Sequence, residues 1–153
     1  MKIKTLLTCA AVAVMAAGSV HAIQQETAAP AEALSEKVRG FLKKEMRLLA
    51  ESGRAIEGAL AAGDSTTVAD EAAKMHEAFV HKDEVTTFDL RILKAALGED
   101  FVDQDKAFHV LATELETLAK VGDDTQQRAV FDAMLRACAA CHKAYAPEAP
   151  VLE

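Results

Sequence analysis

The sequence predicts an all-α protein, an antiparallel up-down-up-down four-helix bundle, and two observations carry this prediction. After about residue 33, apolar residues recur every three or four positions with charged residues between them, which is the periodicity of amphipathic helices. The composition agrees, because the chain has no Trp, one Tyr, seven Gly and three Pro. Abundant Ala, Leu, Glu and Lys likewise favour helices over sheets.

The first 22 residues have the pattern of a secretory signal peptide. Lys2 and Lys4 precede an apolar run over residues 6–17, and residues 20–22 (Val-His-Ala) place small side chains where signal peptidase cleaves. The apolar run is too short to span a bilayer. We therefore expect cleavage after residue 22, export to the periplasm, no stable membrane insertion of the mature chain, and a loose leader over residues 23–33.

The bundle domain is expected over residues 34–147. The first helix begins near Leu34 and ends at Gly63, where glycine can adopt the left-handed cap, and Ser65 or Thr66 can cap the second helix. The helical phase of the second helix slips across residues 81–84. This slip predicts that the second helix is kinked or broken near residues 81–85.

Two further helices follow in the second half of the chain. Residues 98–103 are expected to form a loop, with Asp100 or Asp103 capping a third helix that ends at Gly122. The fourth helix starts within residues 123–125 and stops before Pro147, because proline cannot continue a helix. Residues 148–153 are then expected to be a flexible tail.

The charge of the chain narrows the classes of partner. Removing the signal peptide takes away two lysines and no acid, so the formal net charge falls from -7 to -9. Such a surface disfavours nucleic acids and anionic membranes and favours partners with a basic docking face. The 131 residues that remain of 153 suit one domain with a single core.

One motif near the end of the chain carries chemistry: residues 138–142, Cys-Ala-Ala-Cys-His. A C-x-x-C-H sequence is the attachment signature of c-type haem. On a helix, residues three and four apart share a face. Cys138 and Cys141 can therefore form thioethers with the two haem vinyl groups, while His142 reaches the iron as the proximal ligand.

Besides a chance occurrence, the motif could be half of a structural zinc site or a thioredoxin-like redox pair. A structural zinc site needs four nitrogen or sulfur ligands, and the only other cysteine, Cys9, is lost with the signal peptide. A thioredoxin-like redox pair lies near a βαβ pattern, which this chain lacks. The sequence therefore favours one covalent haem c, with its iron, bound through Cys138, Cys141 and His142.

A signal peptide, four helices and a lone C-x-x-C-H in the last helix resemble the class II c-type cytochromes, cytochrome c′ and its low-spin relatives such as cytochrome c-556. Class I cytochromes carry their motif near the N-terminus instead. The resemblance implies that a first-helix residue covers the distal haem face, and that this residue is Met in six-coordinate members. Met46 matches that position, between Leu42 and Leu49, although a Met on an apolar helical face can also be core filling.

Other residues bear on the iron ligands. The chain has Ala146 where cytochrome c′ often has a basic residue, and Leu42 where the first helix commonly has Arg, which weakens the match to the gas-binding c′ type. Met134 is expected in the core. The histidines at 76, 81 and 109 are expected at the surface or core edge, with His109 and then His76 as the next candidates if Met46 is not the ligand.

The function expected from these features is electron transfer by a periplasmic mono-haem cytochrome with His/Met ligation, a carrier that is not an enzyme. It would act with periplasmic redox partners, and a homodimer is compatible with the resemblance. The alternative is a five-coordinate cytochrome c′-like protein that binds nitric oxide or carbon monoxide. A peroxidase would need an open iron site and a distal acid/base group; His109 or His76 could be that group, but nothing in the sequence fixes their position.

Overall fold

The computed structural model describes residues 30–78 and 85–151, and the expected signal peptide, most of the leader and residues 152–153 lie outside them. The described residues form five α-helices and one short 3-10 helix, with no strand among them. The all-α prediction is confirmed. None of the described helices is long and apolar enough to cross a membrane.

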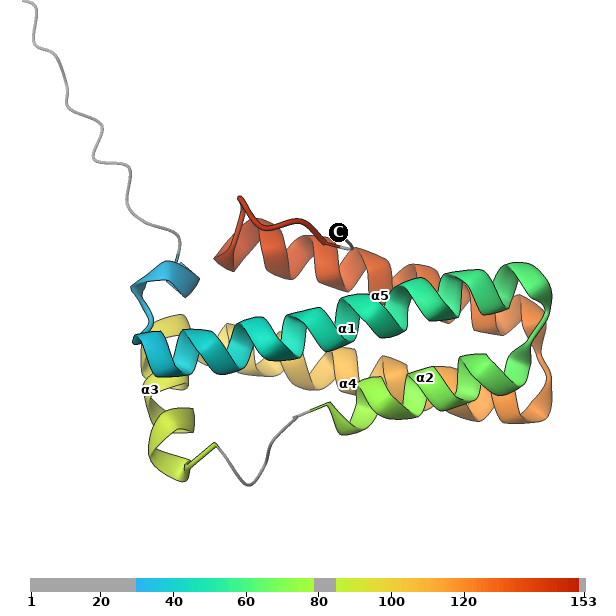
Figure 1. Ribbon diagram of the computed structural model, residues 1–153, viewed down its shortest axis with the longest axis horizontal. Coiled ribbons are helices and arrows are strands. Elements are labelled where there is room, and N and C mark those ends of the chain that lie inside the picture. The colour runs from blue at the N-terminus through green and yellow to red at the C-terminus, as the bar shows by residue number, and fades with distance from the viewer. Residues whose placement is uncertain (1–29, 79–84, 152–153) are drawn as a thin grey trace, which may run out of the picture.

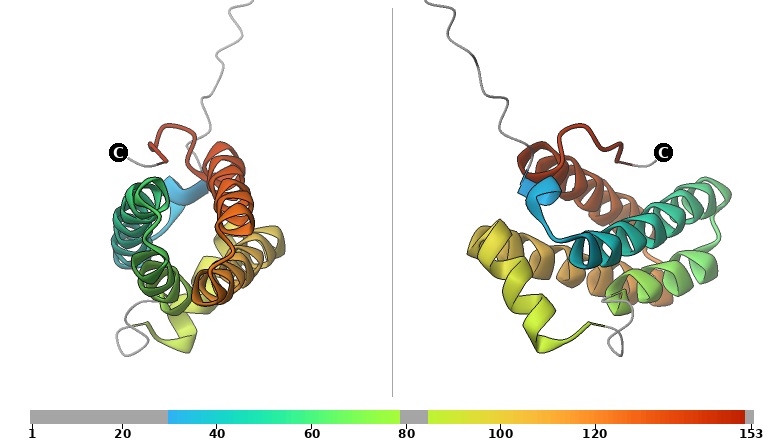
Figure 2. Two further views of the ribbon diagram at one scale, coloured as in Figure 1. Left: turned by 90° about the vertical axis from the view of Figure 1, so that its right-hand side faces the viewer. Right: turned by 60° about the vertical axis from the view of Figure 1, so that its left-hand side comes forward.

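The helices pack as two pairs with a short helix at one end (Figure 1). The pair α1 and α2 runs in opposite directions, as does the pair α4 and α5, and α2 packs extensively against α4. The left view of Figure 2 looks nearly along these four helices and shows them arranged around a common axis. The elements are η1 (Pro30–Ala33), α1 (Glu36–Ala62), α2 (Ser65–Glu77), α3 (Thr87–Leu97), α4 (Glu99–Val121) and α5 (Asp124–Tyr145).

Two Gly-Asp pairs make the tight turns of these helix pairs. Gly63 and Gly122 end α1 and α4 in the left-handed conformation, with φ of 71° and 76°, as the sequence predicts. The side chains of Asp64 and Asp123 then cap α2 and α5 by accepting backbone N–H bonds from Thr67 and Gln126. The cap of α2 is therefore Asp64, and the expected cap at Ser65 or Thr66 is wrong.

The region between the pairs differs from expectation. The expected break near residues 81–85 falls mainly on residues 79–84, outside the described part, and on either side α2 ends at Glu77 and α3 begins at Thr87. The expected loop over residues 98–103 is wrong. Gly98, with φ of 88°, alone separates α3 from α4, and acidic Glu99 and Asp100 in the first turn of α4 favour helix initiation there.

The buried apolar residues form two clusters at different levels along the helices. The larger cluster includes Ile56, Val68, Leu115 and Met134, and Met134 is 1% exposed, as expected of a core residue. The smaller cluster lies at the α3 end and is made by Leu34, Val38, Leu97 and Phe101. The core is therefore divided along the helix axes, and the two motif cysteines pack against different clusters, Cys138 against the larger and Cys141 against the smaller.

Asp89 fastens α3 to α1. Its carboxylate accepts a hydrogen bond from the Lys37 ammonium at 2.7 Å and forms a capping box with Thr86 at the start of α3. Hydrogen bonds from Lys37 and then from Thr86 hold the pKa of Asp89 at about 2, below its usual value of 3.8. The ionised carboxylate therefore stabilises the junction above about pH 4, and this stabilisation is lost as the pH falls towards 2.

Asp89→Asn is expected to lower the melting temperature at pH 7, because the amide cannot replace the charged acceptor of Lys37. The difference from the unsubstituted protein should shrink as the pH is lowered from about 4 towards 2. Thermal melts followed by circular dichroism measure both effects, with the exposed Asp103→Asn as the matched control. Equal melting temperatures at pH 7 would contradict the role given to Asp89.

Candidate functional site

The C-x-x-C-H motif lies in the last turns of α5. Cys138 and Cys141 are free thiols, and both are half-buried. Cys138 packs against the larger apolar cluster, whereas Cys141 packs against the smaller one. The two thiols therefore lie on one face of α5, each against a different apolar cluster.

The two thiols are not activated. Burial, with a smaller effect of Cys141, raises the pKa of Cys138 to about 11, and burial followed by the charge of Asp105 raises the pKa of Cys141. A redox-active pair of the thioredoxin type needs a lowered pKa, since the thiolate is the nucleophile. This environment disfavours the dithiol interpretation of the motif.

His142 is oriented by the segment that follows α5. Its Nδ1 lies 3.0 Å from the carbonyl oxygen of Ala149, because residues 146–151 turn back along α5 (Figure 1). A carbonyl oxygen can only accept, so Nδ1 carries the proton and donates it. In the neutral imidazole, the lone pair is then on Nε2, the arrangement that metal-binding histidines have when their other nitrogen is fixed by a backbone carbonyl.

Met46 lies on a different helix, half-buried on α1. Leu42, one turn before it, packs against the smaller cluster, and Leu49, one turn after it, packs against the larger one. Cys141 and Cys138 border the same two clusters on α5. Met46 and the motif therefore occupy the same level of the molecule, on two helices that contact each other sparsely.

This donor set fits a haem. Two half-buried thiols on one helical face, an imidazole with its Nε2 lone pair available and a thioether on another helix are the groups that attach and ligate haem c. Apolar side chains of the two clusters border the thiols. The four donor side chains are enough to attach and ligate a haem, and no additional acidic or basic group is needed.

The other histidines lie as expected where they are described. His76 is exposed on α2, with its Nδ1 2.8 Å from the hydroxyl of Thr113. His109 lies on α4 with its side chain 16% exposed, and its ring contacts that of Phe108 in the larger cluster edge to face. His81 lies outside the described residues.

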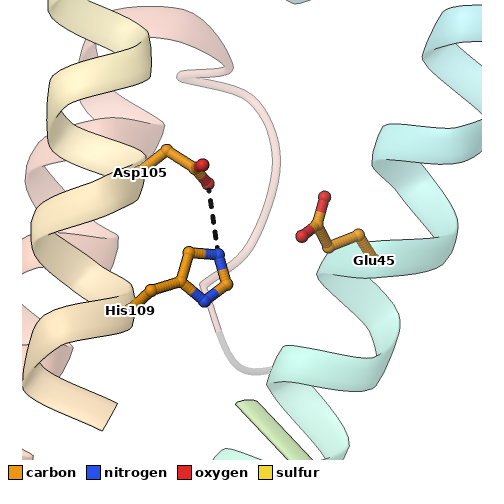
Figure 3. A group of neighbouring side chains, drawn as sticks. All are labelled: Glu45, Asp105 and His109. Carbon is orange, nitrogen blue, oxygen red and sulfur yellow. Dashed lines mark ion pairs between the residues drawn. The ribbon is translucent and has the colours of Figure 1, made fainter. Parts of the chain in front are cut away.

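One group of polar side chains was not predicted (Figure 3). Glu45 of α1 points towards Asp105 and His109 of α4, and one ligand atom from each lies within 4.8 Å of the others. Burial, followed by the charge of Asp105, raises the pKa of Glu45 to about 7, while the carboxylate of Asp105 raises the pKa of His109. The four-residue spacing of Asp105 and His109 was a usable sequence signal, but nothing local indicated Glu45.

Comparisons with known proteins identify no relative of this chain. The chain matches no family model, no curated protein and no solved structure. The case for a function therefore rests on the motif, the helices that carry it and the geometry described above.

Proposed function

We propose that this chain is an exported mono-haem c-type cytochrome of class II, built as an antiparallel up-down-up-down four-helix bundle, that transfers electrons in the periplasm. One observation carries the proposal: the C-x-x-C-H motif lies on a single helix with both thiols half-buried and with His142 Nδ1 bonded to the Ala149 carbonyl. The opposed directions of α1, α2, α4 and α5 are those that the bundle requires.

In this proposal the chain's own residues hold the haem and its iron. Cys138 and Cys141 attach the haem covalently, and His142 Nε2 binds the iron on the proximal side. The hydrogen bond to Ala149 fixes the orientation of the imidazole. The bound haem would supply one-electron redox chemistry, at a potential that Met ligation raises relative to two nitrogen ligands.

Met46 is the distal ligand in this proposal, in preference to His109. The Nδ1 of His109 donates to the Met75 carbonyl at 3.0 Å, and its Nε2 lies 3.7 Å from the carboxylate of Asp105. His109 would have to leave both neighbours to reach an iron held by α5. Met46 would give up no strong hydrogen bond on binding iron, because a thioether is only a weak hydrogen-bond acceptor.

We propose that the acidic mature chain binds periplasmic redox partners that have a basic docking face. The association rates with such partners should fall as the ionic strength rises. An electron carrier needs no substrate pocket and no catalytic residue. We therefore propose a carrier that is not an enzyme.

Optical spectra of the purified exported protein in both oxidation states test the proposal. His/Met ligation predicts low-spin haem in both states, with a weak near-infrared band from sulfur-to-iron charge transfer in the ferric form. A high-spin spectrum together with rapid carbon monoxide binding would contradict Met46 ligation and favour the five-coordinate, gas-binding alternative. The absence of haem absorbance would contradict the cytochrome proposal as a whole.

A further inference from the structure

The cluster of Glu45, Asp105 and His109 contains no residue of the C-x-x-C-H motif, although the Asp105 carboxylate lies close enough to Cys141 to raise the pKa of that thiol. We propose that this cluster is a binding site for a divalent transition-metal cation, with Zn²⁺ as the representative ion. The site lies between α1 and α4 and is built from one imidazole nitrogen and two carboxylates (Figure 3).

The spacing of the ligand atoms suits one ion. Zinc binds histidine nitrogen and carboxylate oxygen at about 2.0–2.2 Å, so ligand atoms around a single ion lie roughly 3–4 Å apart. Here the three ligand atoms already lie within 4.8 Å of one another. Small rotations of the Glu45 and Asp105 side chains would therefore complete the coordination.

His109 is oriented for this role. Its Nδ1–H donates to the backbone carbonyl of Met75 at 3.0 Å, which leaves the lone pair on Nε2 in the neutral ring. That nitrogen is the atom that faces Asp105 and Glu45. Metal-binding histidines commonly have their second nitrogen fixed in this way.

An independent observation points to a missing cation. Glu45 Oε1 and His109 Nε2 are both buried, and neither has a hydrogen-bond partner among the described residues, with the Asp105 carboxylate 3.7 Å from Nε2. Buried polar atoms are nearly always paired, and an unpaired one costs about 1–3 kcal/mol. A cation at the centre of the cluster would bind both atoms and would also offset the repulsion between the carboxylates of Glu45 and Asp105.

The donor set indicates the class of ion. One imidazole and two carboxylates are borderline to hard ligands, which suit zinc, manganese or ferrous iron better than the thiol-preferring cuprous ion. Three protein ligands leave at least one position for water. The motif cysteines are not needed, so the inference does not rest on the proposed haem.

The test measures Zn²⁺ binding by titration calorimetry to the mature, exported protein after treatment with a chelator. We expect one Zn²⁺ per chain, and binding at least about tenfold weaker in His109→Ala and in Glu45→Gln. Two exposed residues provide matched controls, His76→Ala and Glu114→Gln, which should bind Zn²⁺ like the unsubstituted protein. Circular dichroism confirms that each variant is folded.

No Zn²⁺ uptake by the unsubstituted protein would overturn the site, as would equal affinity in the folded Glu45→Gln variant. Haem attachment is scored separately, by the mass of the same preparation. Covalent haem without Zn²⁺ uptake overturns the metal site alone. In a matured chain that carries no haem, the free motif thiols could also bind Zn²⁺. Such a chain overturns the cytochrome proposal, and it supports the metal site only where Glu45→Gln weakens its Zn²⁺ uptake.

Discussion

Replacing both Cys138 and Cys141 with alanine is expected to abolish covalent haem attachment and to leave a chain that unfolds early and over a broad temperature range. The first effect follows because the two thiols supply both thioether bonds. The second follows because the apolar clusters that the cysteines border would lose the macrocycle between them. Burial of apolar surface contributes about 25 cal/mol per Å², and a ligand bound only by the folded state adds to its stability.

Haem staining of a denaturing gel measures the first effect, and thermal melts followed by circular dichroism measure the second. Each single replacement should weaken attachment without removing it. Cys9→Ala is the matched control, because this cysteine lies in the expected signal peptide and should not alter the exported product. Haem that stays attached to the double variant, or a sharp transition at the temperature of the haem-loaded protein, would contradict the prediction.

Met46→Ala is expected to convert a low-spin haem into a high-spin haem that binds carbon monoxide readily. Alanine removes the thioether without supplying another ligand, so the sixth position of the iron opens. Because Met46 is only half-buried, the loss of packing should cost no more than about 2 kcal/mol, the lower end for Met→Ala, in addition to the lost bond to iron. Absorption spectra with and without carbon monoxide measure the change.

Met134→Ala is the matched control for this experiment. Met134 is fully buried in the larger cluster, so its truncation should cost about 2–5 kcal/mol of unfolding free energy. It should nevertheless leave the spin state unchanged, because Met134 lies on the same helix as His142, eight residues earlier. A low-spin spectrum that survives Met46→Ala would instead indicate a histidine ligand, and His109→Ala would then identify it.

Helix ends were predictable where their signals are local. Gly63 and Gly122 end helices because glycine adopts the left-handed conformation at low cost, and Pro147 lies just beyond the end of α5. The loop expected over residues 98–103 was wrong because a single glycine with positive φ is enough to turn the chain from α3 into α4. Residue periodicity carries no information about such an abrupt junction.

The candidate site was likewise predictable only where its residues are close together in the sequence. Cys138, Cys141 and His142 are contiguous in sequence, so their common location on one helix follows from the motif itself. The bond from His142 to Ala149 depends on how the chain turns back after α5, and the approach of Glu45 to His109 depends on the register of α1 against α4. Both arrangements depend on how the folded chain packs, which a short stretch of sequence does not encode.

The mass of the exported, purified protein is the direct test of covalent haem attachment. We expect a chain that begins at Ile23 and is heavier than the bare polypeptide by one haem, with no loss of that haem on extraction with acidified organic solvent. A mature mass equal to that of the bare chain would contradict covalent attachment through Cys138 and Cys141, as would a haem that the solvent removes.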